Sequence, residues 1–255
     1  MKRAMAVEHL KLRRSMVVVV TTVFVVVFIP LLCVGFVAIA KRGGAGAAAL
    51  KAQAIVVGEG WEGYIGVLGQ MVSVAMFIGP GMVVTWAFGR EHSDRTFPSL
   101  FALPVSRRSI AAAKLVVLAG WGLALIVLLL LSSVVAGLLT GVGPLDGVDL
   151  VARLARLGLA GFLTALLALT IGFVASVGRG YLPALGAMIL LTVITQIAVL
   201  FGTGGWFPYA TPGLYALAGA EGIPEVSALQ LLLVPVTVGS VAWLTVRWWE
   251  RAEVV

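Results

Sequence analysis

Charged and turn-forming residues gather in one stretch of an otherwise apolar chain, residues 88–115. This stretch, called the charged island, holds five of the eighteen basic side chains and two carboxylates. Ser93 or Asp94 can cap a short helix over residues 95–103, which Pro104 would end. A short helix across the mouth of two membrane helices can dock on a second protein and act as a lever. The chemistry predicted here is therefore recognition.

Catalytic and metal-binding patterns are missing from the sequence. The single Cys33 sits in an apolar run and has no partner for a disulfide or a CxxC site. His9 and His92 are isolated, so zinc chemistry has no support. No two carboxylates, histidines or cysteines converge within an apolar segment, as an active site requires. The chain also has no Gly-Lys dipeptide, so it lacks a P-loop. An enzyme is disfavoured, and no cofactor is expected in this chain.

The polar residues of the long apolar segments are neutral. Thr192, Thr195 and Gln196 share one helical face by their i, i+3, i+4 spacing and could line a translocation path. The alternative is hydrogen bonding between helices, a common use of Thr and Gln in membranes. Because ionisable residues mark ion and proton pathways, their absence from the predicted spans disfavours ion-driven transport.

Composition places the chain in a membrane. Hydrophobic residues make up 61% and charged residues 11% of its 255 residues, whereas soluble domains carry about 25% charged residues. The net charge of +7 is explained by the placement of basic loops on one side of the membrane, so nucleic acid is not an expected partner.

Six apolar segments are each long enough to cross a bilayer, which predicts an all-α polytopic protein of one domain, residues 1–255. The first segment follows a basic stretch and could imitate a signal peptide, but its length favours an uncleaved anchor. Pro30 can kink it, and Ser106 can cap the helix that leads into the third span. The predicted spans are residues 16–40, 65–88, 115–139, 157–177, 182–201 and 229–246.

The segments between the spans carry further predictions. Residues 1–15 are expected to form an interfacial elbow helix, with a flexible basic anchor as the alternative. A short helix is expected near residues 45–57. Residues 202–228 are too apolar for a loop and too broken to span, which predicts a re-entrant helical hairpin. The alternative is that their aromatic residues anchor an interface. Other aromatic residues are expected at the two interfaces of the membrane, namely Trp61, Tyr64, Trp248 and Trp249.

Basic residues set the orientation. With this topology, thirteen basic residues fall on the cytoplasmic side and five outside. Because Lys and Arg are enriched in cytoplasmic loops, both termini and the coupling loop, residues 89–114, are predicted to be cytoplasmic. The expected location is the plasma membrane of a bacterial-type cell.

The charged island resembles the signature loop of ABC type-2 transporter permeases. That loop reads as Glu, then Gly-Thr, an apolar helix, Pro-Val-Ser-Arg and a Lys that opens the third span. The sequence departs from it at Arg95, where the family usually has Gly, and at Pro98 within the helix. The matching residues here are Glu91, Asp94, Thr96, residues 103–108 and Lys114.

The resemblance implies a coupling helix that docks on a separate P-loop ATPase, which would bind ATP and Mg. Its apolar residues would form the buried anchor, and Glu91 and Arg107 a polar rim, with Glu91 as a charged contact or hinge pin. A second permease chain, identical or similar, would complete the complex in the bilayer. The ATPase-coupling residues implied are Glu91, Asp94, Arg95, Thr96, Phe97, Leu100, Phe101, Pro104 and Arg107.

The function implied by the resemblance is the membrane subunit of an ABC exporter for a hydrophobic or amphipathic compound, such as a drug, an antimicrobial peptide or a lipid. Two alternatives remain open. One is an ABC complex that serves metalloenzyme maturation or signalling, and the other is a membrane scaffold without an ATPase.

Overall fold

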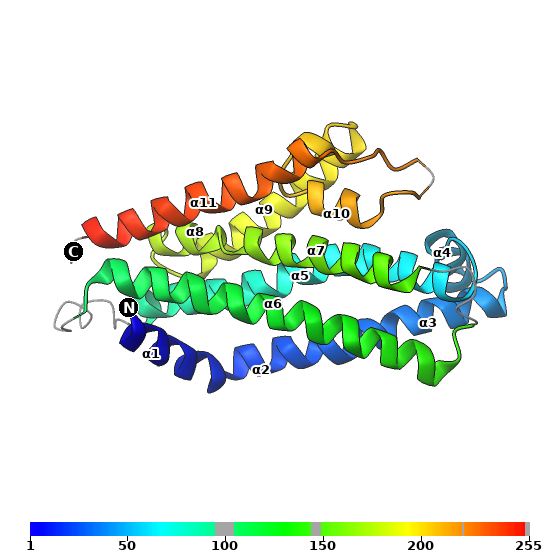
Figure 1. Cartoon of the computed structure of the whole chain (residues 1–255), viewed down its shortest axis with the longest axis horizontal. Helices are drawn as coiled ribbons and strands as arrows, with labels where there is room; N and C mark the ends of the chain where they lie inside the picture. The colour runs from blue at the N-terminus through cyan, green and yellow to red at the C-terminus, as the bar shows by residue number, and fades with distance from the viewer. Residues whose placement is uncertain (95–104, 144–148, 221, 253–255) are drawn as a thin grey trace.

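The computed structural model describes residues 1–94, 105–143, 149–220 and 222–252. Within these ranges the regular structure is helical and contains no strand. The helices form an elongated bundle, and the two chain ends lie together at one end of it (Figure 1). We call this the terminal end. The fold class predicted from the sequence is confirmed.

The chain begins with α1 (Lys2–Arg13), which meets a long helix after Ser15. This long helix consists of α2 (Met16–Val23), the π-helical η1 (Phe24–Phe28) and α3 (Ile29–Arg42). The π-helical turn directly precedes Pro30. Proline lacks an N–H and its ring crowds the carbonyl four residues earlier, so the helix loses a backbone hydrogen bond at Pro30, close to this turn.

Two long helices flank the charged island. After α4 (Ala47–Ile55), in the region where a short helix was expected, come α5 (Gly60–Ser93) and α6 (Arg107–Thr140). Asp94 is the C-cap of α5, and the helix that it was predicted to start, residues 95–103, lies outside the described residues. Ser106 caps α6 as predicted, and its hydroxyl accepts from the Ser109 N–H.

The remaining helices follow with short connections. They are α7 (Leu150–Ala168), α8 (Ile171–Val177), α9 (Tyr181–Leu200), the 3-10 turn η3 (Gly204–Trp206), α10 (Thr211–Ala216) and α11 (Ala228–Arg251). Between α8 and α9, Arg179 adopts a positive φ of 53° that lets the chain reverse. The η3 and α10 turns occupy the stretch predicted as a re-entrant hairpin. Their dip into the membrane stays a prediction.

In the described residues, six helical segments are long and apolar enough to span a membrane. They extend past the apolar segments of the sequence; α5, for example, begins before residue 65 and continues beyond residue 88. Charged residues that flank an apolar segment therefore belong to the same helix, as at both ends of α5. The six segments are Met16–Arg42, Gly60–Ser93, Arg107–Thr140, Leu150–Val177, Tyr181–Leu200 and Ala228–Arg251.

Helix α5 forms the centre of the bundle and packs against α3, α7, α8 and α9. In its most apolar part 67% of the residues are buried, against 11% in α9 and in α11. These two helices lie along one side of the bundle (Figure 1). Their apolar side chains are thus available to lipid or to another protein.

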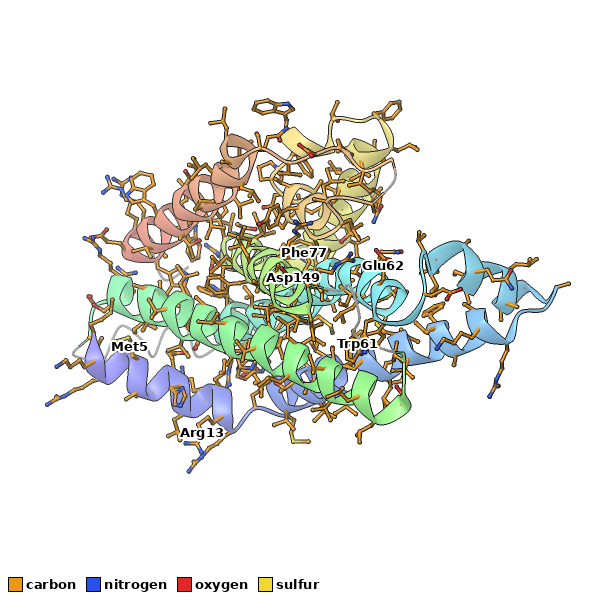
Figure 2. The ribbon with its side chains drawn as sticks, turned by 45° about the vertical axis from the view of Figure 1, so that its right-hand side comes forward. Met5, Arg13, Trp61, Glu62, Phe77 and Asp149 are labelled. Carbon is orange, nitrogen blue, oxygen red and sulfur yellow. The ribbon has the colours of Figure 1, made fainter. Side chains whose placement is uncertain are left out.

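Aromatic residues that were expected at the membrane interfaces lie inside the bundle. Trp61, labelled in Figure 2, packs against α6 so closely that a Cβ at Gly137 would fall 2.5 Å from its ring. The Tyr64 hydroxyl donates to the Ser133 carbonyl. Trp249 is also fully buried. Each of these three rings fills space between helices that the sequence pattern does not reveal, and their position at a membrane interface stays a prediction.

Candidate functional site

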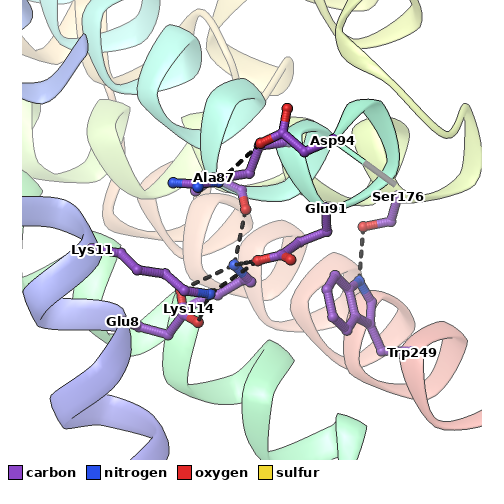
Figure 3. A network of polar contacts seen from close by, with 9 residues as sticks. Glu8, Lys11, Ala87, Glu91, Asp94, Lys114, Ser176 and Trp249 are labelled. Atoms are coloured by element: carbon purple, nitrogen blue, oxygen red, sulfur yellow. Dashed lines mark hydrogen bonds and ion pairs between the residues drawn. The ribbon is translucent and has the colours of Figure 1, made fainter. Parts of the chain in front are cut away.

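Four charged side chains meet inside the terminal end of the bundle. Lys114 of α6 is 1% exposed, and its Nζ donates to Glu91 Oε1 of α5 at 2.9 Å and to Glu8 Oε2 of α1 at 3.0 Å. The same nitrogen donates to the Ala87 carbonyl at 2.9 Å. Figure 3 shows these contacts converging on Lys114. All three of its N–H groups are thereby used by three different acceptors.

Lys11 completes this set, which we call the elbow network. Its Nζ lies 2.8 Å from Glu8 Oε1 and 3.1 Å from Glu91 Oε1. Two carboxylates and two ammonium groups therefore alternate between α1, α5 and α6. Burial lowers the pKa of Lys11, but hydrogen bonding and charge attraction from Glu8 and Glu91 outweigh it, so the pKa is raised. The network is balanced in charge.

Helical spacing explains how the network is positioned. Ala4, Glu8 and Leu12 repeat every four residues and form the buried face of α1. Ala87 and Glu91 are likewise one turn apart on α5. The elbow helix therefore presents a carboxylate, in an apolar stripe, directly to the basic residue of α6.

The network specifies the position of the elbow more than it stabilises the fold. Burying two charges costs desolvation energy that their attraction often only balances, whereas removal of one partner costs about 3–5 kcal/mol. A displaced α1 would leave Lys114 and Glu91 with fewer partners in a buried place. Movement of α5 or α6 is thus transmitted to α1, since the charges favour one arrangement.

Glu91 was expected on an exposed polar rim, and the structure corrects that placement. The residue is 3% exposed, and its carboxylate points toward α1 and α6. Its position agrees better with the alternative of a pin between helices. Asp94, the neighbouring site residue, is half-exposed and lies 3.8 Å from Arg90.

Arg107 at the start of α6 contacts the end of the last helix. Its guanidinium donates to the Ala252 carbonyl and, at 3.0 Å, to the Glu250 carbonyl. Nearby, Trp249 donates through Nε1 to Ser176 Oγ at 2.9 Å. The side chain implied as a docking rim thus also holds the C-terminal part of α11 to α6.

The other coupling residues implied by the resemblance lie outside the described residues. These are Arg95, Thr96, Phe97, Leu100, Phe101 and Pro104. Both described ends of the loop, Asp94 and Ser106, lie next to helices joined by the elbow network. The loop therefore joins two helices that both contribute a side chain to the elbow network.

A second polar cluster lies away from the elbow network. Thr192, Thr195 and Gln196 of α9 line a pocket of 390 Å³ between α5, α7, α9 and α10. We call it the α9 pocket. The side chains lining it carry no formal charge. Its polar lining residues on other elements are Gln70, Ser73, Thr164 and Tyr209.

The two threonines bond within their own helix. Thr192 and Thr195 hydroxyls donate to the Met188 and Leu191 carbonyls at 2.9 and 2.7 Å. Each hydroxyl oxygen retains lone pairs that can accept a further hydrogen bond. In the described structure the recorded bonds of both threonines stay within α9, and the choice between a translocation path and interhelical bonding stays a prediction. Apolar walls with neutral acceptors suit an amphipathic, uncharged ligand.

The described part of the chain contains no cluster of three or more side chains suited to hold a metal ion. The residues that sequence reasoning missed are Glu8 and Lys11. A signal existed, because Glu8 is the only acidic residue among the basic ones of residues 1–15. An acid on the same helical face as Ala4 and Leu12 indicates a buried partner of opposite charge.

Comparisons with known proteins agree on one group. The model of a family described as ABC-2 family transporter protein matches residues 4–197. The chain is also similar to the bacitracin transport permease protein of Bacillus licheniformis. The two are 25% identical over 147 residues, which cover 57% of this chain and 69% of that permease. The family match includes the elbow network and Thr192, Thr195 and Gln196 of the α9 pocket.

Proposed function

This chain belongs to the ABC-2 family of transporter proteins and is an ABC transporter membrane subunit, and we propose that it exports a hydrophobic or amphipathic compound. A drug, an antimicrobial peptide or a lipid fits this description. ATP would be hydrolysed with Mg by a separate P-loop ATPase. The permease of Bacillus licheniformis, named for the transport of bacitracin, supports the amphipathic peptide class.

The observation that carries the proposal is the elbow network at the two ends of the coupling loop. Glu91 lies near the start of the loop and Lys114 is its last residue, and both bond to α1. An ATPase that moves the loop would shift α5 and α6 together with the elbow. The orientation that puts this end in the cytoplasm follows from the basic residues.

The α9 pocket supports the export path. Its side chains come from α5, α7, α9 and the turn at α10, and α9 is mostly unburied in the single chain. We propose that a second permease chain, identical or similar, covers the exposed face of α9. The pocket would then face an enclosed path between two subunits. Neutral lining groups favour solutes without strong charge, because charge is costly in such surroundings.

Purification and a transport screen test the proposal together. The tagged permease should copurify with an ATPase, in a particle with paired membrane chains. A strain without the permease should become more sensitive to at least one amphipathic compound in a resistance panel, and the gene should restore resistance. An ATP-hydrolysing particle with one membrane chain would contradict the paired assembly. Normal sensitivity to every compound would contradict the exporter.

A further inference from the structure

A groove of 530 Å³ lies where α1 meets the first turn of α2 and the end of α5. We call it the elbow groove. Three cationic side chains line it, and no acidic residue does. Exposed apolar residues complete the walls. Its cations are Lys11, Arg14 and Arg90, and its principal apolar and aromatic residues are Leu10, Met16 and Trp86.

Charge in the groove is not fully balanced by the protein. Lys11 is held by Glu8 and Glu91 behind it. Arg90 stacks over the Trp86 ring at 4.9 Å, and its ion-pair partner among the described residues is the half-exposed Asp94 at 3.8 Å. Such exposed pairs contribute little. Among the described residues, no carboxylate forms an ion pair with Arg14. The groove therefore presents positive charge that an anion can neutralise.

We propose that the elbow groove binds the phosphate headgroup of an anionic membrane phospholipid. Arginine is well suited to phosphate because its planar guanidinium can donate two parallel hydrogen bonds. The first turn of α2 adds to this, since Met16 and Val17 line the groove and are the first two residues of a helix, whose start favours an anion.

The surface that continues from the groove favours a lipid over a soluble phosphate. Met16 is 72% exposed, and an apolar exposed stripe runs from it along the same helix through Val20, Phe24 and Val27. These residues recur at intervals of three to four positions and so share one face. An acyl chain can lie along this stripe while its headgroup stays in the groove. A soluble anion would have no contact with the stripe.

The groove also contacts the elbow network. Lys11 belongs to both, so its position depends on Glu8 and Glu91 as well as on a bound headgroup. A lipid held there would connect the membrane surface to the residues that position α1. This inference rests on the membrane-embedded fold and holds whatever compound the transporter moves.

Native mass spectrometry of the purified full-length chain tests the site. The probes are phosphatidylglycerol and phosphatidylcholine with identical acyl chains. Wild-type protein should retain phosphatidylglycerol preferentially. Arg14→Gln should weaken that binding about fivefold, on the order expected for one basic residue at a membrane surface. Arg90→Gln should act in the same direction, and Arg14→Lys should keep only part of the affinity, because an ammonium group retains the charge but cannot donate two parallel hydrogen bonds from a planar fork.

Arg13→Gln is the matched control. Arg13 is adjacent in sequence, carries the same charge and extends away from the bundle (Figure 2). It does not line the groove. Equal losses in Arg13→Gln and Arg14→Gln would overturn the site in favour of diffuse attraction. Equal retention of both lipids would overturn the preference for anionic headgroups. If millimolar inorganic phosphate displaces phosphatidylglycerol, the groove is a site for a soluble anion, and the lipid assignment is overturned.

Discussion

The ammonium group of Lys114 lies 2.9 Å from the Glu91 carboxylate, although 23 residues separate them in the chain. The pair joins α5 to α6 at the base of the charged island, since Glu91 lies in the last turn of α5 and Lys114 in the N-terminal part of α6. Glu8 joins the pair from a position 106 residues away from Lys114. The elbow helix is thus fixed to both sides of the coupling loop by one buried ammonium group.

Glu91 and Lys114 should be energetically coupled, so neutralising both should cost less stability than the two single changes added together. Lys114→Met leaves two carboxylates with only Lys11, and Glu91→Gln leaves an excess of buried positive charge, so each should cost about 3–5 kcal/mol of stability. The double variant keeps the Glu8–Lys11 pair and should cost less than the sum of the singles. Thermal unfolding of the purified protein measures this. Additive costs would show that the two residues are not coupled.

The contribution of Lys11 to stability should be lost only at strongly alkaline pH, where its ammonium group is deprotonated. The pKa of Lys11 is raised from 10.5 because Glu8 and Glu91 outweigh the effect of burial. A folded-state pKa above the unfolded one gives stability that is complete below pH 10.5 and is lost as the pH rises through the folded-state pKa. Below pH 10.5, the melting temperature of the wild-type protein should exceed that of Lys11→Gln by a constant amount. A difference that vanishes near neutral pH would contradict this assignment.

Packing should outweigh charge where the coupling helix meets the ATPase. Burying a large apolar side chain contributes about 1.5–3 kcal/mol, whereas an exposed charge pair contributes under about 1 kcal/mol. Leu100→Asp or Phe101→Asp should therefore dissociate or uncouple the ATPase, and Arg107→Ala should do much less. Copurification and substrate-stimulated ATP hydrolysis, at matched expression, are the measurements. If both aspartate variants keep full coupling to the ATPase, residues 95–103 do not form the docking helix.

The α9 pocket should control which compound is transported. Replacing Thr192, Thr195 and Gln196 together by Ala removes three neutral polar groups from the wall but no recorded interhelical bond. We expect altered selectivity with intact assembly, measured by resistance profiles and by native mass. Thr22→Ala is the control, because its hydroxyl also donates to its own helix, to the Val18 carbonyl, and does not line the pocket. Lost assembly with unchanged selectivity would favour a structural role.

Two glycines of α6 should respond oppositely to alanine. At Gly137 a Cβ would meet the Trp61 ring at 2.5 Å, so Gly137→Ala should destabilise the bundle. At Gly120 no atom lies within 4 Å of the added carbon. Gly120→Ala should therefore raise stability by up to about 1 kcal/mol, because alanine is the better helix former. The midpoints of thermal unfolding in detergent measure both effects. Equal shifts of the midpoint in the two variants would contradict the close contact between Gly137 and Trp61.

Local features of the sequence predicted the helices. The six apolar runs gave the spanning helices, because a run of that length can satisfy its backbone in a membrane only as a helix. Ser106 was recognised as an N-cap since capping depends on a few neighbouring residues. Helical periodicity also placed Thr192, Thr195 and Gln196 on one face, and this face lines a pocket.

Tertiary structure decided which faces meet. Nothing local to Glu91 distinguishes an exposed rim from a buried contact, since its partners come from α1 and α6. Trp61 and Tyr64 have the composition of an interface belt, yet both fill space against α6. By itself the sequence determined a six-helix membrane protein with a charged loop. Pairings across the chain depend on the rotation and packing of whole helices, and these put Glu8, Glu91 and Lys114 together.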